Sequence, residues 1–450
     1  MKVLLIHPEE ARSKYDFKGI IENECLDLEY LWAILEKEGH EVALWDGKIE
    51  ERKAADVIDE FVPDAVFFSG RDFQENFLLE YARYAREHHP ERIIIMSGIH
   101  AQLCSDRLMH PFVDYVLKSF DFYKVPEILR LHGTKDALSA FEKMDDICYK
   151  KDGVWVSNPS VPFDITRLGR PNRTYFDEHP NNYNYLDLPH AAWVRTAYCC
   201  PYRCKFCMRN HMNTGKYTRR DIADVVEEIA EIKSDNIYIV DDDFLYDEER
   251  ILTFIRLIKE KGIRKKYICY GRSDFIATHE EIVKELADIG FYYFLVGLET
   301  IREKDIGKYN KRSTLKYNEE SIRLCHKYGV HMMAMFILDL DFTREDFRNL
   351  YKWIKKYELK HVAVSIYTPE MGLPESEVYR DRIISWNPGD YDYLHLVCKP
   401  DNLSVKAYYR CYYRLMIKLF LKAKRDGVYD FLDYGSYIKD FMKGVFRPKA

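Results

Sequence analysis

Short runs of apolar residues alternate with amphipathic stretches along most of the chain. In the first part, five such runs have the length and composition of buried strands: 2–7, 41–46, 64–70, 92–98 and 113–119. Stretches with helical spacing of apolar residues lie between them. Short strands separated by helices predict an α/β fold with a doubly wound, Rossmann-like parallel sheet, which binds ligands beyond the carboxyl ends of its strands.

The alternation returns from Ala192 onward after a stretch rich in Pro, Asn and Asp. Six apolar runs follow, at 193–198, 236–241, 267–271, 292–299, 332–338 and 362–367. Each of the first five precedes a helical pattern, and Thr343 with Asp346 forms a capping box at the start of one such helix. Six βα units in series predict a partial (β/α)6 barrel, whose chemistry belongs at the carboxyl ends of its strands.

These patterns divide the chain into four parts: a Rossmann-like domain at 1–135, a linker of irregular structure at 136–188, the partial barrel at 189–375 and a small helical region at 376–450. The last part contains a Tyr-rich, basic helical stretch at 407–425. We expect it to form a helix that covers the mouth of the barrel.

Composition and charge narrow the classes of protein. The formal charge of -6 includes no clustered basic excess of the kind that binds nucleic acid, so no nucleic-acid partner is expected. No apolar run is long enough to span a membrane, and the first ten residues do not resemble a signal peptide. We therefore expect a cytoplasmic protein, in which tightly clustered cysteines indicate metal binding or catalysis rather than disulfides.

One loop concentrates cysteines directly after the first barrel strand. Cys200, Cys204 and Cys207 are spaced CxxxCxxC, and Cys199 next to them is interpreted as a packed thiol. Three thiolates bind three irons of a cubane cluster and leave the fourth iron open, as a reactive site requires. The alternative is a zinc site completed by His211.

The CxxxCxxC loop after the first strand of a βα series resembles that of the radical S-adenosylmethionine (SAM) enzymes, and the preceding sheet looks like their cobalamin-binding domain. The resemblance covers residues 1 to 400. It implies a [4Fe-4S] cluster on Cys200, Cys204 and Cys207 whose open iron chelates SAM. An electron from the cluster would then generate a 5′-deoxyadenosyl radical.

Later strand ends are similar to the SAM-binding segments of that family. IVDDDF at 239–244 resembles the motif near the SAM amino group, with Asp242 and Asp243 as candidates, and a helix cap or solvated turn is the alternative. In GRSD and GLET, Arg272 would pair with the SAM carboxylate and Glu299 would bind the ribose; both residues would otherwise form internal salt bridges. FILDLDFT departs from the usual glycine-containing fifth-strand turn, whereas YTPEMGLP resembles the sixth-strand segment near adenine.

The first domain lacks the DxHxxG motif that supplies a cobalt ligand in the best-known cobalamin domains. Its SGIHAQL segment resembles a turn placed under the corrin, which makes Ser97, Gly98 and His100 candidate cobalamin contacts. Arg71, after the third strand, is the candidate for the lower face of cobalt, where a guanidinium offers no lone pair; the alternative is a surface arginine. His7 is a further possible neighbour.

The resemblance and the two-domain layout together predict a cobalamin-dependent methyltransferase that acts on an unactivated carbon. Two alternatives stay open: a non-methylating relative that cyclises or oxidises its substrate, and a cluster-based redox sensor or zinc protein without enzymatic activity. Expected partners are a peptide, protein or small-molecule substrate, with a slight preference for a peptide or protein, and an electron donor such as flavodoxin or ferredoxin. No residue is assigned as catalytic.

Overall fold

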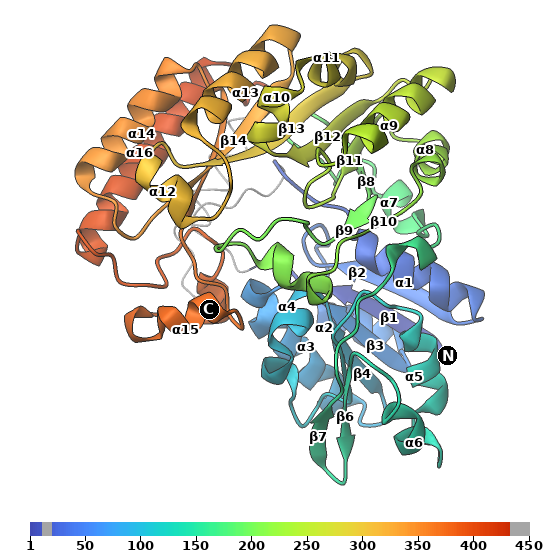
Figure 1. Cartoon of the computed structure of the whole chain (residues 1–450). Helices are drawn as coiled ribbons and strands as arrows, with labels where there is room; N and C mark the ends of the chain where they lie inside the picture. The colour runs from blue at the N-terminus through green and yellow to red at the C-terminus, as the bar shows by residue number, and fades with distance from the viewer. Residues whose placement is uncertain (11–19, 433–450) are drawn as a thin grey trace.

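The computed structural model describes residues 1–10 and 20–432. It contains two parallel sheets, one in each half of the chain (Figure 1). The lower part of the figure holds the first sheet, and the upper part holds a curved six-stranded sheet with helices on its outer side. The predicted fold class is thus confirmed, and the carboxyl ends of the barrel strands face the first domain.

The first sheet has seven strands in the order β2-β1-β3-β4-β5-β6-β7. The first five are parallel and lie within one or two residues of their predicted positions: β1 Lys2–His7, β2 Glu41–Asp46, β3 Ala65–Ser69, β4 Ile93–Ser97 and β5 Tyr115–Leu117. The order changes direction between β1 and β3, the kind of position at which doubly wound sheets bind ligands. The strands are almost continuously apolar because helices cover both faces.

The helices of the first half are α1 Leu26–Lys37, α2 Ala54–Phe61, α3 Glu75–His88, α4 Ile99–Cys104, α5 Lys124–Leu131, α6 Ala137–Phe141 and α7 Thr174–Glu178. The sheet continues past residue 135, where a linker was expected. An antiparallel hairpin, β6 Ile147–Lys151 with β7 Val154–Ser157, joins its edge. Both strands of the hairpin are short, and β7 at the edge of the sheet buries no side chain.

The second sheet has the order β15-β14-β13-β12-β11-β8, and all pairs are parallel. Its strands are β8 Ala191–Val194, β11 Asn236–Ile239, β12 Lys266–Gly271, β13 Phe291–Glu299, β14 His331–Leu338 and β15 His361–Ile366. The helices around it are α8 Ile222–Glu231, α9 Glu248–Glu260, α10 Ser273–Thr278, α11 Glu280–Asp288, α12 Glu303–Lys308, α13 Leu315–Tyr328 and α14 Arg344–Lys356. Six strands in sequential order form the partial barrel that the pattern predicts.

The helical region after the barrel contains α15 Pro374–Val378 and the long α16 Val405–Arg425. The prediction that this helix covers the barrel mouth is wrong. The Tyr408 hydroxyl bonds to Leu338 O at one end of β14, and Lys422 Nζ bonds to Leu359 O before β15, so α16 runs along the outer wall beside α14 (Figure 1). Its basic residues other than Lys422 are exposed, whereas its apolar stripe packs on the wall.

None of the helices that the structure describes has the length and apolarity to cross a membrane.

Candidate active site at the carboxyl end of the barrel

A short antiparallel pair of β-strands closes the base of the cysteine loop. β9, Ala197–Tyr198, pairs antiparallel with β10, Thr218–Arg219, and the cysteines lie between them. Asp241 accepts hydrogen bonds from the backbone nitrogens of Thr196 and Ala197 at 2.7 and 2.9 Å, which fixes the chain as it leaves β8. These contacts shape the loop from within the protein, and the first of the three consecutive aspartates is therefore structural.

The loop is also braced between the cysteines. The Asn210 side-chain amide donates to the carbonyls of Cys204 and Cys207, at 2.9 and 3.1 Å. Cys200, Cys204 and Cys207 are half-buried, whereas Cys199 is fully buried and donates to Arg209 O, as expected of a packed thiol. Burial raises the pKa of Cys207 to about 12 and that of Cys200 further. Thiols in such a setting become thiolates when a bound metal compensates their charge.

The spacing of the ligand atoms separates the cluster from the zinc alternative. Tetrahedral zinc with Zn–S bonds of about 2.3 Å requires ligand atoms about 3.8 Å apart. Within the described part of the chain, no three of Cys200, Cys204, Cys207 and His211 bring their ligand atoms within 4.8 Å of one another. His211 is moreover exposed. The three cysteines and His211 are therefore not arranged around a single zinc ion.

The two candidate aspartates have different surroundings. Asp242 is paired with Arg209, whose Nε lies 3.2 Å from Asp242 Oδ1. Asp243 is buried, and neither of its carboxylate oxygens has a hydrogen-bond partner among the described residues. Burial raises the pKa of Asp243, and Arg272 and Lys311 oppose this shift from a distance. A buried carboxylate without a donor suits a cationic ligand, and the ammonium group of SAM has the required charge and donors.

The two charged residues expected to bind the SAM carboxylate and ribose are each paired inside the protein. Arg272 forms two hydrogen bonds to Asp274, at 2.9 and 2.8 Å, and lies 3.9 Å above the ring of Tyr202 in the cysteine loop. Glu299 has a left-handed φ of +60° and bonds to Lys311 Nζ at 2.5 Å. The internal salt bridges considered from the sequence are present, with these partners. Contact of either residue with SAM stays a prediction.

The carboxyl edge of the first sheet reaches the same region through Arg71. Its Nη2 donates to the Tyr393 hydroxyl at 3.1 Å and lies 4.0 Å from Met208 Sδ, one residue after Cys207. The Arg71 Nε is buried without a partner among the described residues. Arg71 is therefore not a surface arginine, and it lies where the first sheet, the cysteine loop and the C-terminal region meet.

The other candidate cobalamin contacts are occupied within the first domain. His100 is buried with Nε2 2.6 Å from Glu75 Oε2, and Arg107 binds the same carboxylate. The Ser97 hydroxyl donates to Leu117 O at 3.2 Å. Gly98 has φ +96°, and a Cβ there would lie 2.5 Å from the backbone of Gly70, so the glycine is needed for contact between two loops. Cobalamin contacts for these residues stay predictions.

His7 ends β1 but turns toward the neighbouring strand. Its Nδ1 lies 3.2 Å from Asp46 Oδ1, and the Cys25 thiol donates to Asp46 Oδ2 at 3.0 Å. Burial opposes the ionisation of Asp46, but the Lys48 ammonium and His7 hold the pKa of Asp46 well below its usual range. This cluster already contains its balancing cation.

Two residues that the sequence did not mark complete the junction at Arg71. Tyr393, held at φ +62°, donates its hydroxyl to Glu370 in the segment after β15. Burial, with a contribution from nearby Asp72, raises the pKa of Glu370 to about 8. Tyr393 belongs to no motif, and Glu370 lies in the YTPEMGLP segment but was not singled out there. Their proximity depends on the return of the chain after α15. Lys311 and Arg209 were missed for the same reason.

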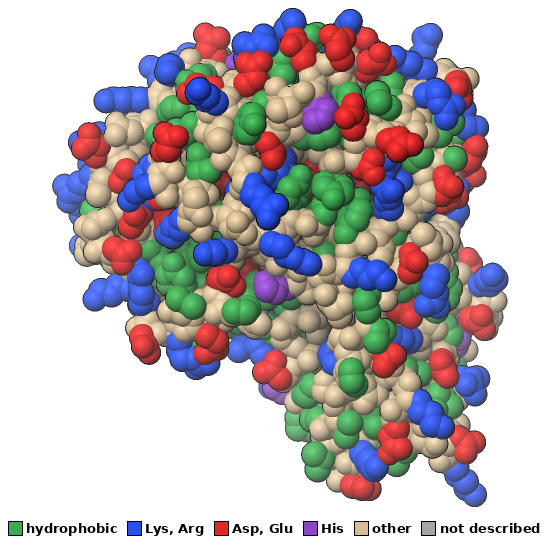
Figure 2. Space-filling model, in the orientation of Figure 1, with side chains coloured by type: hydrophobic (Ala, Val, Ile, Leu, Met, Phe, Trp, Pro, Cys, Tyr) green, Lys and Arg blue, Asp and Glu red, His purple; other side chains and the backbone are tan. Residues whose placement is uncertain are grey.

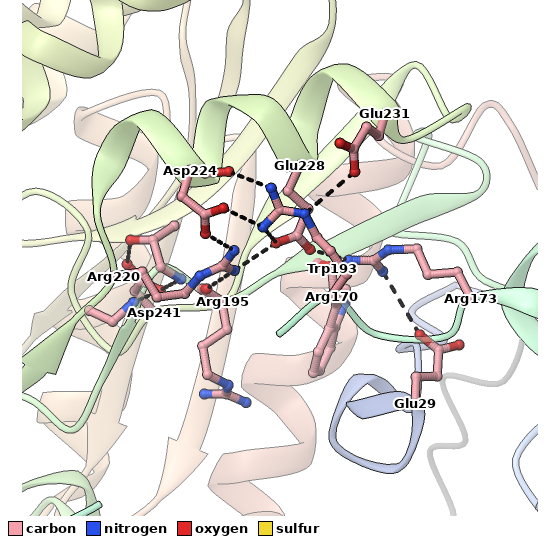
Figure 3. Close-up of polar contacts among 12 residues, drawn as sticks. Glu29, Arg170, Arg173, Trp193, Arg195, Arg220, Asp224, Glu228, Glu231 and Asp241 are labelled. Atoms are coloured by element: carbon pink, nitrogen blue, oxygen red, sulfur yellow. Dashed lines mark hydrogen bonds and ion pairs between the residues drawn. The ribbon is translucent and has the colours of Figure 1, made fainter. Parts of the chain in front are cut away.

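A buried ionic cluster joins the first domain to the barrel (Figure 3). Arg173, in the segment between the domains, pairs with Glu24 and lies 2.9 Å from Glu228 Oε1 on α8. Arg220 bonds to the other oxygen of Glu228 at 2.6 Å. These side chains are nearly inaccessible to solvent, with Glu24 at 0% and Glu228 at 2% exposure. We call Glu24, Arg173, Arg220 and Glu228 the ionic clamp.

Comparison with known proteins identifies both halves. The family model of the Radical SAM superfamily matches residues 194–354, and that of the B12 binding domain matches residues 24–120. The first match begins at the last residue of β8 and includes all three cluster cysteines, and the second covers β2 to β5.

Similar proteins extend over most of the chain. Hopanoid C-3 methylase of Methylococcus capsulatus is 25% identical over 91% of this chain and 78% of its own length. Anaerobic magnesium-protoporphyrin IX monomethyl ester cyclase of Cereibacter sphaeroides is 20% identical over 90% of this chain and 68% of its own length. In fold, the chain resembles TsrM from Kitasatospora setae (TM-score 0.67, 17% identity, 93% of this chain and 90% of that chain) and OxsB (TM-score 0.72, 15% identity, 97% and 72%).

The chain belongs to the cobalamin-binding radical SAM family. It is a radical SAM enzyme, with a [4Fe-4S] cluster, SAM and cobalamin as its cofactors. The interpretation as a zinc protein or redox sensor without enzymatic activity is set aside.

Proposed function

We propose that the enzyme transfers a methyl group from SAM, by way of cobalamin, to an unactivated carbon of its substrate. The observation that carries this proposal is the meeting of the two cofactor-binding edges: Arg71 of the first sheet contacts Met208 beside Cys207, and Gln102 of α4 accepts a hydrogen bond from Tyr198 at 2.7 Å. A methyl carrier and a radical source held this close act on one substrate atom.

Relatives support methyl transfer. Besides the hopanoid methylase, they include two bacteriochlorophyllide d methyltransferases of Chlorobaculum tepidum and the cytidylyl-2-hydroxyethylphosphonate methyltransferase of Streptomyces wedmorensis. These names describe small-molecule substrates, so we propose a small molecule in place of the peptide or protein favoured from the sequence. The cyclase of Cereibacter sphaeroides supports the non-methylating alternative.

When bound, the cluster supplies the electron that cleaves SAM, and cobalamin carries the methyl group. The protein's residues position these groups. Cys200, Cys204 and Cys207 would hold the cluster, and Asp243, whose oxygens have no partner among the described residues, would accept hydrogen bonds from the SAM ammonium. Arg71 would face bound cobalamin, and its guanidinium has no lone pair to offer to cobalt.

The test is anaerobic turnover of the reconstituted enzyme with SAM that carries a deuterated methyl group. Methyl transfer predicts 5′-deoxyadenosine and S-adenosylhomocysteine formed in step, and the label in the product by mass spectrometry. Formation of 5′-deoxyadenosine without S-adenosylhomocysteine would support the cyclising or oxidising alternative. Candidate substrates are chosen from the products of neighbouring genes.

The role of Arg71 is tested separately. We expect Arg71→Ala to change the absorption spectrum of bound cobalamin and to lower methyl transfer, while iron content stays the same. Arg83→Ala on the exterior of α3 serves as the matched control. An unchanged spectrum and unchanged turnover would contradict the assignment of Arg71 to the lower face of cobalt.

A further inference from the structure

The cysteine loop differs in charge from the rest of the chain. Between Cys199 and Arg220 there is no Asp or Glu, whereas the whole chain has 74 acidic and 68 basic residues. The same segment contains the basic residues Arg203, Lys205, Arg209, Lys216, Arg219 and Arg220. A local excess of one sign in an acidic protein requires an explanation.

Half of these cations are neutralised within the fold. Arg209 pairs with Asp242 at 3.2 Å, and Arg220 pairs with Glu228 at 2.6 Å. Arg219 pairs with Asp247 at the start of α9. These three arginines are therefore accounted for as structural ion pairs.

The other three are exposed and have no carboxylate partner within the described ranges. Lys205 lies between Cys204 and Cys207, and Arg203 directly precedes Cys204. The Arg203 guanidinium donates to the carbonyls of Asn210 and Gly215, both at 2.9 Å. This contact brings Arg203 next to the residue that precedes Lys216, so the cysteine loop carries all three exposed charges.

A neighbouring segment adds a fourth exposed cation. The Asn310 amide donates to Arg203 O at 2.9 Å, and Lys205 N donates to Tyr309 O at 3.1 Å, so the segment after α12 packs on the cysteine loop. Arg312 follows in this segment and is exposed. We call Arg203, Lys205, Lys216 and Arg312 the basic rim.

The basic rim lies on an open face of the molecule. Figure 1 shows the segment after β9 across the centre of the view, between the barrel and the first domain. In Figure 2, which has the same orientation, Lys and Arg side chains are gathered over that central region. The cysteines beneath are half-buried, so the cluster that they hold is close to this surface.

We propose that the basic rim is the docking surface for an acidic one-electron carrier protein. This inference rests on the proposed function, because radical chemistry at the cluster requires reduction from outside. One electron leaves the carrier and enters the cluster held by Cys200, Cys204 and Cys207, and no atoms are exchanged. A cationic surface steers an acidic partner to this face and suppresses other orientations.

The test compares Lys205→Glu/Lys216→Glu with wild type, with Arg410→Glu/Arg414→Glu as the matched control. Arg410 and Arg414 are exposed cations on α16, on the outer wall of the barrel. Binding of flavodoxin, as an acidic probe, is measured by calorimetry between low and high salt. We expect the rim variant to bind about tenfold more weakly at low salt and to lose the salt dependence, whereas the control variant matches wild type.

Two further measurements distinguish a docking role of the basic rim from an effect on the cluster or on folding. Reduction of the cluster by dithionite, which needs no docking surface, is expected to be the same in all three proteins. Iron content and thermal stability should also match; Lys205→Gln/Lys216→Gln replaces the double Glu variant if they do not.

Equal flavodoxin affinity of the rim variant and wild type would overturn the proposal. So would equally impaired reduction by dithionite, which would assign the cations to the cluster itself, or a raised KM for substrate with unchanged flavodoxin binding. None of these measurements except the last depends on methyl transfer, so failure of the proposed function leaves this test intact.

Discussion

The carboxyl edges of the two parallel sheets meet in this enzyme, but their polar side chains differ in how far they are paired within the protein. At the edge of the first sheet, His100 and Arg107 both bond to Glu75, and Gly98 packs against Gly70. At the edge of the barrel, three thiols with raised pKa values lie near Asp243, whose oxygens have no partner in the described part of the chain.

This difference indicates two ways to bind a cofactor. The barrel edge keeps desolvated polar groups for its ligand, at a cost in stability that the ligand offsets. The edge of the first sheet pairs most of its polar groups with one another, apart from Arg71 Nε and His100 Nδ1. It presents a preformed surface from which Arg71 contacts Tyr393 and Met208. Substitutions at the barrel edge should therefore affect ligand binding, and substitutions at the first edge should affect stability.

The largest effect is expected at the cysteines. Cys204→Ala should reduce iron and sulfide to background and abolish SAM cleavage, because the cubane loses one of three ligands. Iron analysis and 5′-deoxyadenosine formation measure this. Cys199→Ala is the control and should keep its cluster, since the Cys199 thiol is buried and bonded to Arg209 O. A variant at Cys204 with full iron content would contradict the ligand assignment.

Substitutions in the ionic clamp test how much it contributes to the stability of the junction between the two domains. Arg173→Ala should lower the free energy of unfolding by about 3–5 kcal/mol, because it leaves buried carboxylates without their cation. Arg170→Ala is the comparison; this side chain is one-third exposed and should cost less than about 1 kcal/mol. Denaturant titration measures both values. An equal loss of unfolding free energy in the two variants would show that burial of the clamp does not increase its contribution to stability.

At Asp243, ligand binding and stability should change in opposite directions. Asp243→Asn should weaken SAM binding by about tenfold to a hundredfold, since it removes a charged acceptor. The ligand-free variant should be at least as stable as wild type, because a buried charge without a donor is gone. Calorimetry measures the affinity for SAM, and thermal melting measures the stability. Asp242→Asn should instead lose stability, because it deprives Arg209 of its partner.

Substitution of His100 tests whether the edge of the first sheet contributes to stability rather than to cobalamin binding. His100→Ala should cost about 1–3 kcal/mol of stability, because it removes a partner of the buried Glu75 carboxylate. The absorption spectrum of bound cobalamin should stay the same. A spectral shift without loss of stability would make His100 a cobalamin contact and would remove the contrast between the edges.

A different kind of effect, a change in the pH dependence of stability, is expected at the junction. Folded Glu370 keeps its proton up to pH about 8, whereas the unfolded carboxyl releases it near 4.5. The folded state therefore binds more protons between these values, and its contribution to stability is lost as pH rises toward 8. Glu370→Gln should flatten this part of the stability profile, as measured by denaturation from pH 5 to 8. An unchanged slope would show that Glu370 is ionised in the folded enzyme.

The sequence predicted most of the fold because buried parallel strands are continuous apolar runs. β1 and β2 lie where they were expected, and the capping box of Thr343 with Asp346 is present. The hairpin β6–β7 was missed because its strands are short and lie in a stretch without clear periodicity. The outer position of α16 was missed because an apolar stripe does not reveal which surface it covers.

The site was predictable only where residues are close in the chain. The cysteines form a local motif, so their grouping could be read directly. Arg209, Lys311, Glu370 and Tyr393 come together through the tertiary fold, and no spacing marks them. The distinction between Asp242 and Asp243 likewise depends on Arg209, which pairs with one and leaves the other free.

The ionic clamp has a consequence for how the enzyme unfolds. Its members come from before α1, from the interdomain segment, from the turn after β10 and from α8. Neither half can therefore open without exposing a charge that the other half neutralises. The two cofactor domains should therefore melt in a single cooperative transition. Cleavage of the connecting segment would leave two fragments that remain associated.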